Sequence, residues 1–115
     1  ATTARRGVEE EFEAGVSAAR AVLFVQESDQ KSEMAKEALE EMGVKFNEME
    51  LINAVGLDSI EPSSAYLGYM EGKTGTAELP QIHFRGGKGI AGIDAIFDAQ
   101  DSGELLKMFK AAGAA

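Results

Sequence analysis

Hydrophobic residues recur along this chain with two periods, one typical of helices and one typical of strands. Over 8–20 the acidic residues lie mostly away from a single apolar helical stripe, which predicts an amphipathic helix. The stripe consists of Val8, Phe12, Val16 and Ala19. The run AVLFV at 21–25 is instead continuously apolar, which is typical of a central strand buried on both faces.

The clearest helix is predicted over 29–42, where apolar residues return at helical spacing. These residues are Met34, Ala35, Ala38, Leu39 and Met42. Gly43 then supplies the left-handed conformation that ends a helix. The next segment, VKFNEMEL at 44–51, predicts a second strand, although its alternation changes phase between Phe46 and Met49. A bulge or an early strand end near Asn47 would account for that change.

The second half of the chain predicts a helix and then a β-hairpin. Pro62 fits the first turn of a helix that runs to about Glu71, and Gly72 and Gly75 are expected to end it. Its buried side would be formed by Ala65, Tyr66, Tyr69 and Met70. Further on, apolar and polar residues alternate over 82–85, Gly86-Gly87 can form a tight turn, and a return strand follows over 89–91.

Two short helices are predicted after the hairpin. Asp94 is expected to cap the first, which runs through Ala99, and Ser102 is expected to cap the second. A right-handed β-α-β crossover would make the first two strands parallel, and the hairpin would add an antiparallel pair. With no internal repeat and no long linker, the chain is expected to be one domain, 1–115, with an ordered core over 8–110.

Composition narrows the classes of partner. Of the 115 residues, 44% are apolar and 27% charged, as in soluble globular proteins, and the net charge is −9. An acidic surface argues against binding to nucleic acid or to anionic membranes, and no apolar run reaches the roughly 20 residues of a membrane span. The start ATTARRG suggests an excised domain or a processed protein, and we expect an intracellular protein, cytoplasmic rather than organellar.

The residue types exclude several chemistries. Without cysteine the chain has no disulfide, no thiolate zinc site and no thiol nucleophile. His83 is the only histidine, so a multi-histidine metal site is excluded, and its position between Ile82 and Phe84 predicts a packing or surface role. We therefore expect no catalytic residue, no metal and no enzymatic activity.

Several segments resemble glutaredoxins. The segment ELPQIHFRGGKGIAGIDAIFDAQDSGELLKMF at 78–109 is similar to the glutaredoxin tail, in which a Pro-Gln strand, a glycine turn, an aspartate and Ser-Gly-Glu-Leu follow in order. MAKEALEEMGVKF and AVLF resemble the family's second helix and first strand. The resemblance implies an α/β, thioredoxin-like fold: a mixed four-stranded sheet flanked by helices, here with an extra N-terminal helix. A more distant similarity links the chain to the Src-homology-three-binding, glutamate-rich family.

The resemblance also locates a site. The family's Cys-x-x-Cys motif falls on Asp29-Gln30-Lys31-Ser32, where Asp29 or Ser32 would cap the helix. The family's glutathione groove would comprise Leu79, a cis-Pro80, Gly92 and Asp94. Gln26 replaces the lysine that precedes the motif, and alanines replace a second glycine and a second aspartate. These losses predict that glutathione is not retained as a cofactor.

The leading hypothesis is a redox-inactive glutaredoxin-like domain that serves as a protein-interaction or scaffold module within a larger chain or complex. Its contact surface would comprise Gln26, Asp29, Gln30, Lys31, Ser32, Leu79, Pro80, Gly92 and Asp94. Two alternatives remain open. The chain could be a glutathione-binding protein or a thiol-independent small-molecule carrier, or it could be a Cys-to-Ser variant of an active glutaredoxin.

Overall fold

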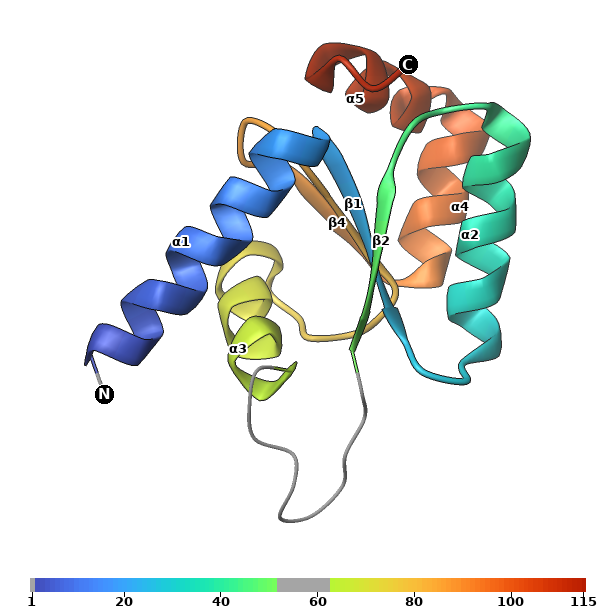
Figure 1. Cartoon of the computed structure of the whole chain (residues 1–115). Helices are drawn as coiled ribbons and strands as arrows, with labels where there is room; N and C mark the ends of the chain where they lie inside the picture. Colours follow the sequence, from blue (N-terminus) through green and yellow to red (C-terminus); the bar gives the residue numbers. More distant parts are fainter. Residues whose placement is uncertain (1, 52–62) are drawn as a thin grey trace.

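The four strands form one mixed sheet in the order β2-β1-β3-β4, and helices cover both of its faces (Figure 1). The structure is a computed structural model that describes residues 2–51 and 63–115. Its elements are α1 (Thr2–Ala19), β1 (Ala21–Gln26), α2 (Gln30–Met42), β2 (Asn47–Leu51), α3 (Ser63–Thr74), β3 (Gln81–Phe84), β4 (Gly89–Ala91), α4 (Ile93–Ser102) and α5 (Glu104–Ala112).

Strand pairing follows the predicted topology. β1 runs parallel to β2, with Val22 opposite Asn47, and antiparallel to β3, with Leu23 opposite Ile82. β3 and β4 form the predicted antiparallel hairpin. Its turn contains Gly86 and Gly87, which have φ angles of 100° and 99° that side chains with a Cβ rarely adopt. The α/β fold with a mixed four-stranded sheet is therefore confirmed.

The central strand β1 is buried on both faces, as its apolar run predicts. Ala21, Leu23 and Val25 face a core that also contains residues of α2, α4 and α5. Val22 and Phe24 face a second core, which α1 and α3 close on the other side of the sheet. Figure 1 shows the same division, with α1 and α3 on one side of the strands and α2 and α4 on the other.

The predicted second strand begins later than expected. Residues 44–46 precede β2, because the amide of Lys45 bonds to the carbonyl of Ala114 at 2.7 Å rather than to β1. Val44 is nevertheless buried, in the core that faces α2 and α5. The change of phase near Asn47 therefore marks the start of the strand, where the sequence suggested a bulge or a strand end.

Several helix boundaries also differ from prediction, and α1 begins at Thr2 rather than near position 8. α3 continues through Gly72 to Thr74, and only Gly75, with φ 89°, ends it; Pro62 lies outside the described residues. Asp94 lies in the first turn of α4, whose N-cap is Gly92. Ser102 ends α4 and Gly103 is the N-cap of α5, although the Ser102 hydroxyl accepts from the Glu104 amide at 3.4 Å. Gly92 and Gly103 both take positive φ angles, which residues with a Cβ rarely adopt.

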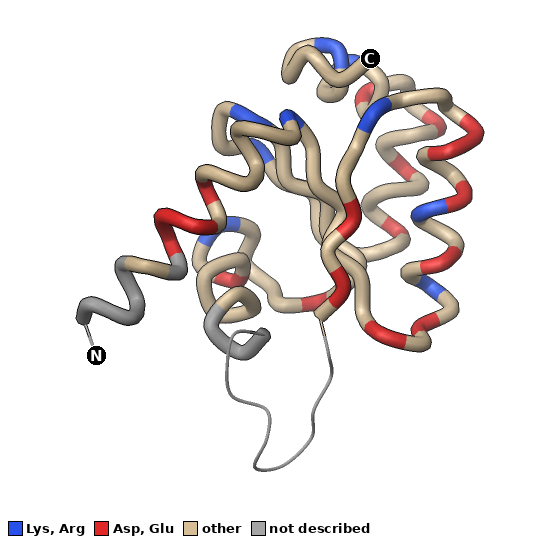
Figure 2. Tube along the Cα trace, in the orientation of Figure 1, with Lys and Arg blue, Asp and Glu red and all other residues tan. Residues whose placement is uncertain are grey.

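Charge is unevenly distributed over the molecule. Figure 2 shows acidic residues along α2, on the described part of α1 and on the outer strand β2. Within the part of the chain that the structure describes, no helix is long and apolar enough to cross a membrane.

Candidate functional site

The start of α2 is held by a network of two side chains. Asp29 is the N-cap of the helix, and its Oδ2 accepts from the Ser32 amide at 3.0 Å and from the Ser32 hydroxyl at 2.9 Å. The same hydroxyl oxygen accepts from the Gln26 amide at 3.0 Å. The predicted capping role of Asp29 is confirmed, and Ser32, only 3% exposed, connects the cap to the end of β1.

A tight turn brings the cap next to the strand ends. The amide of Asp29 bonds to the carbonyl of Gln26 at 3.3 Å, and Ser28 has a φ of 55°. The amide of Glu27 bonds to the carbonyl of Leu51 at 3.2 Å, so the turn is also fixed to the end of β2. These bonds place the start of α2 at one edge of the sheet, where loops of such folds carry their sites.

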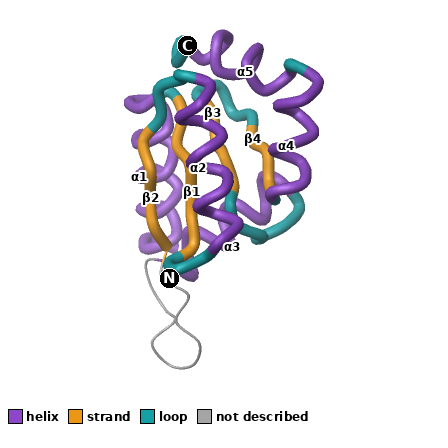
Figure 3. The backbone as a smooth tube through the Cα atoms, turned by 90° about the vertical axis from the view of Figure 1, so that its right-hand side faces the viewer, coloured by secondary structure: helices purple, strands orange, loops and turns teal. Residues whose placement is uncertain are grey.

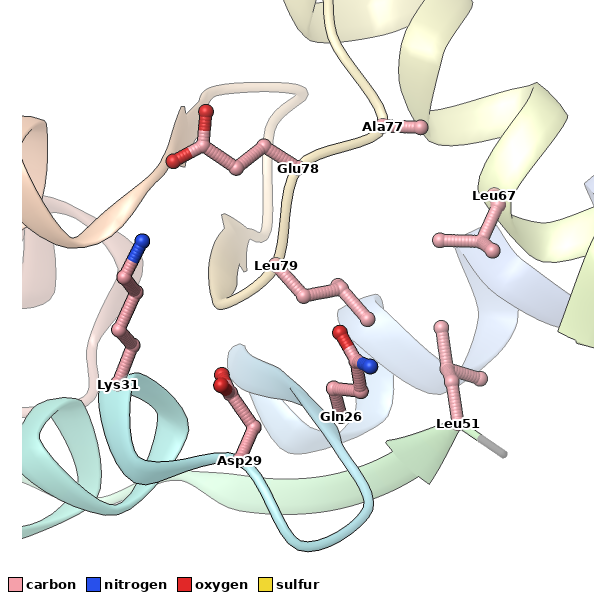
Figure 4. Close-up of a pocket in the computed structure, with 8 residues that line it drawn as sticks. All are labelled: Gln26, Asp29, Lys31, Leu51, Leu67, Ala77, Glu78 and Leu79. Carbon is pink, nitrogen blue, oxygen red and sulfur yellow. The ribbon is translucent and has the colours of Figure 1, made fainter. Parts of the chain in front are cut away.

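A cleft of about 360 Å³ opens at this edge, and we call it the α2 cleft. It is lined by Gln26, Asp29, Lys31, Leu51, Leu67, Ala77, Glu78 and Leu79. Figure 4 shows that Leu51, Leu67 and Leu79 face one another at one end. Asp29, Lys31 and Glu78 surround the other end in the same view. The α2 cleft thus combines an apolar end with a charged end that has two carboxylates and one ammonium group.

The segment that forms the far wall is fixed by polar side chains. Gln81 Nε2 donates to the carbonyl of Thr76 at 2.8 Å, and the hydroxyl of Thr74 donates to the same carbonyl at 2.9 Å. The Thr76 hydroxyl accepts from the Glu78 amide at 3.1 Å. The predicted cis peptide bond joins Leu79 to Pro80. Leu79 and Glu78 therefore reach the α2 cleft from a segment with defined hydrogen bonds.

The start of α4 contacts the segment that forms this wall. The amide of Gly92 bonds to the carbonyl of Pro80 at 2.8 Å. A Cβ added at Gly92 would lie 3.0 Å from Oε2 of Glu78, so the Glu78 carboxylate rests against this glycine. A carboxylate is stabilised at a helix N-terminus by the positive end of the helix dipole. The Glu78 carboxylate therefore lies at the N-terminus of α4, where an anionic ligand would otherwise bind.

The structure brings together four of the predicted site residues. Gln26, Asp29, Lys31 and Leu79 line the α2 cleft. The other five do not line it: Gln30, Ser32, Pro80, Gly92 and Asp94. Sequence reasoning did not assign Leu51, Leu67, Ala77 or Glu78 to the site. The position of Glu78 directly before Leu79-Pro80 was a usable signal, whereas Leu67 reaches the α2 cleft only through the packing of α3.

His83 lies elsewhere, inside the core between the sheet and α1. It is 1% exposed, and its ring meets those of Phe12 and Phe24 edge-on at centroid distances of 5.0 and 5.5 Å. Nε2 lies 2.8 Å from Oε1 of Gln81, and because that oxygen only accepts, Nε2 carries the proton. Burial lowers the pKa of His83 to about 4, and nearby Lys73 adds to the effect. The predicted packing role of His83 is confirmed.

The tyrosines of α3 also serve packing. The Tyr66 hydroxyl donates to Glu11 of α1 at 2.9 Å, and the Tyr69 hydroxyl donates to Glu13. The bond to Glu13, together with burial, raises the pKa of Tyr69 to about 12. Lys73 completes the group with an ion pair to Glu13 at 2.8 Å. Among the described residues, no three His, Asp or Glu side chains are grouped to hold a metal ion.

Comparisons with known proteins identify the fold. No protein-family model matches the sequence, and no curated protein matches it significantly. A buckwheat glutaredoxin solved in complex with glutathione has a TM-score of 0.78 and 22% identity, covering 96% of this chain and 94% of that one. The reduced glutaredoxin C1 of Populus tremula x tremuloides gives 0.77 and 23%, covering 98% and 91%. Oxidized glutaredoxin 2 of Chlamydomonas reinhardtii gives 0.74 and 21%, covering 96% and 98%.

The chain therefore has a glutaredoxin-like thioredoxin fold, and its sequence contains no cysteine. The start of α2, where the resemblance placed the family's thiol motif, holds Asp29 and Ser32 bonded to each other. A carboxylate or a serine hydroxyl does not exchange with a disulfide. The similarity to the Src-homology-three-binding family stays a prediction.

The α2 cleft does not fit glutathione well. Glutathione is a tripeptide with a carboxylate at each end, and such a ligand needs positive charge or free helix N-termini. Here the amide of Ser32 is already bonded to Asp29, and Glu78 lies against Gly92 at the start of α4. Among the described residues, Lys31 is the single cationic side chain that lines the cleft. The carboxylates of Asp29 and Glu78 at the charged end would repel a carboxylate of this ligand.

Proposed function

We propose that the chain is a redox-inactive module of glutaredoxin-like fold that binds a protein partner through the α2 cleft. The observation that carries the proposal is the pairing of an apolar end with a charged end at the position of the missing thiol. Binding pockets typically combine apolar walls with a few fixed polar groups, which set orientation and specificity. With the thiol absent, recognition is the function that the α2 cleft can still perform.

The lining residues indicate the chemistry of the partner. Leu51, Leu67 and Leu79 would accept an apolar side chain. Asp29 and Glu78 would accept a lysine or arginine next to it, while Lys31 would pair with a carboxylate or a backbone carbonyl. The expected ligand is a short peptide segment with an apolar residue beside a basic one.

A peptide library displayed on phage tests this proposal. Peptides selected by the wild-type protein should lose affinity about tenfold or more with Lys31→Glu or Glu78→Lys, because charge reversal places like charges together at the interface. Lys107→Glu and Glu104→Lys make the same charge changes on exposed positions of α5 and should leave affinity unchanged. Asp94→Ala is a further control, because Asp94 does not line the α2 cleft. Equal losses in both sets of variants would reject the α2 cleft as the binding site.

Glutathione is the second candidate ligand. It is favoured by the neighbour that was solved with glutathione. The carboxylates of Asp29 and Glu78 oppose it. The remaining alternative, a Cys-to-Ser variant of an active enzyme, would put the change at Ser32 or Ser28, and the Ser32 hydroxyl already makes two hydrogen bonds. A thiol makes such bonds more weakly, so these contacts favour a serine that belongs to the site.

A further inference from the structure

A second surface depression lies between α2 and α4, on the opposite side of the sheet from α1 and α3. Figure 3 shows the two helices next to each other in front of the sheet. The depression has a volume of about 280 Å³, and we call it the α2–α4 groove. It is lined by Met34, Glu37, Ala38, Glu41, Phe97 and Gln100. It shares no residue with the α2 cleft.

The groove has an apolar floor and an acidic rim. On α2 its residues follow the spacing i, i+3, i+4 and i+7, so they form one stripe along two turns of helix, about 10 Å long. Met34, Ala38 and Phe97 supply the apolar surface, and Met34 is 40% exposed, which is unusual for a large apolar side chain on this molecule. Methionine packs against partners of varied shape because its side chain is unbranched and flexible.

Negative charge predominates around the groove. α2 carries four glutamates against two lysines, and α4 carries three aspartates and no basic residue. One of the two lysines, Lys36, pairs with Glu48 of β2 at 3.2 Å. The uncompensated carboxylates create a negative potential that would attract a basic ligand and steer its approach.

We infer that the α2–α4 groove is a docking site for a short, basic amphipathic helix of a partner protein. The apolar stripe of such a helix fits the floor formed by Met34, Ala38 and Phe97, and its flanking lysines or arginines meet Glu37 and Glu41. Nucleic acid and anionic lipid have the wrong charge for this rim. A second copy of this chain is disfavoured because each copy carries a net charge of −9.

A synthetic peptide tests the inference directly. The probe is a fluorescein-labelled peptide of about 14 residues, with leucines at helical spacing and lysines on both flanks. Its counterpart has glutamate in place of every lysine. The basic peptide should bind with amide shifts centred on 34–41 and 97–100, and its affinity should fall as salt is added. The acidic peptide should not bind.

Matched variants separate local contact from general attraction. Glu37→Lys combined with Glu41→Lys should weaken binding roughly fivefold or more. Glu40→Lys combined with Glu71→Lys changes the net charge equally at exposed positions outside the groove, and should weaken it less than about twofold. Circular dichroism checks that all variants stay folded.

Three results of the peptide experiments would overturn the inference. They are the absence of binding by the basic peptide, equal losses in the two double variants, and amide shifts centred on the α2 cleft instead of the groove. Self-association of the free protein through the groove, detected by sedimentation, would assign the surface to a second copy and also contradict it.

Discussion

Asp29 and Ser32 form hydrogen bonds with each other and with the end of β1. Asp29 Oδ2 accepts two bonds from Ser32, and the Ser32 hydroxyl accepts a third from the Gln26 amide. The first turn of α2 is therefore connected to β1 through side chains. At the residue scale, these two side chains thus have a structural role at the start of α2.

Substitutions that remove the hydrogen bonds of Asp29 or Ser32 should lower the free energy of unfolding by different amounts. Asp29→Ala should reduce the free energy of unfolding by about 1 kcal/mol, and Asp29→Asn by less, because asparagine also caps helices. Ser32→Ala should cost about 1–3 kcal/mol, since it leaves the Gln26 amide without its partner. Urea denaturation of the three variants measures these differences. Unchanged stability in Ser32→Ala would show that the network does not hold α2 to β1.

His83 is the second residue with a measurable consequence. Its ring is buried, and Nδ1 has no hydrogen-bond partner among the described residues. The charged groups near it are Lys73 of α3, which lowers its pKa, and Glu13 of α1, which raises it by a smaller amount. Burial has the largest effect, and the pKa falls from 6.5 to about 4.

This lowered pKa predicts a loss of stability in mild acid. Between pH 6.5 and about 4 the unfolded chain binds a proton at His83 that the folded chain does not bind. Stability should therefore fall as pH decreases through this window, by at most about 3 kcal/mol in total. Urea denaturation from about pH 7 to pH 5 detects the onset of this loss before most carboxylates titrate.

His83→Phe is the matched variant, because it keeps an aromatic ring in the core and removes the titrating group. Its stability should change little over the same pH range. The signals of the single histidine ring, followed by NMR, should not titrate above about pH 5 in the native protein. A ring that titrates near pH 6.5 would contradict the account.

At the scale of elements, α1 is attached to the sheet by one aromatic side chain. Phe12 stacks on Phe24 of β1 at 5.1 Å between ring centroids and meets Tyr69 of α3 edge-on at 4.9 Å. It is only 2% exposed. The hydroxyls of Tyr66 and Tyr69 add bonds to Glu11 and Glu13. The helix is thus fixed by apolar packing at its centre and by polar contacts beside it.

Truncating Phe12 should release this helix. Phe12→Ala should reduce the free energy of unfolding by about 3–5 kcal/mol, and Phe12→Leu by clearly less, because leucine refills part of the space. Glu10→Ala, at an exposed position of the same helix, should change stability by less than about 0.5 kcal/mol. Urea denaturation compares the three. A loss below about 1 kcal/mol in Phe12→Ala would mean that α1 is not part of the cooperative core.

The elements also show what local patterns can predict. The run at 21–25 predicted a strand buried on both faces because burial there needs apolar residues at every position. Residues 44–46 were expected in β2, but the bond between Lys45 and Ala114 is a contact between distant segments that no local pattern contains. Gly72 was expected to end α3, yet a glycine in helical conformation costs a helix only about 1 kcal/mol.

For the whole molecule, the order of the motifs predicted the fold better than the site. Asp29 and Lys31 were assigned to the site because the resemblance placed the motif on 29–32, and Gln26 because it precedes that segment; all three line the α2 cleft. Glu78 and Leu67 were missed because the α2 cleft is assembled from segments that only tertiary packing brings together. The α2 cleft and the α2–α4 groove are each formed by segments that are distant in the sequence, so both are properties of the folded chain.

The central proposal is that the α2 cleft of this glutaredoxin-like fold binds a protein segment and does not bind glutathione. Amide chemical shifts recorded while reduced glutathione is added to about 10 mM test it most directly, since weak binding at about 1 mM would then be detected. The account predicts no saturable shifts over 26–32 or 77–94 in the native protein. Saturable shifts in both segments, weakened by Lys31→Glu and strengthened by Glu78→Gln, would show that the cleft still binds glutathione and would contradict it.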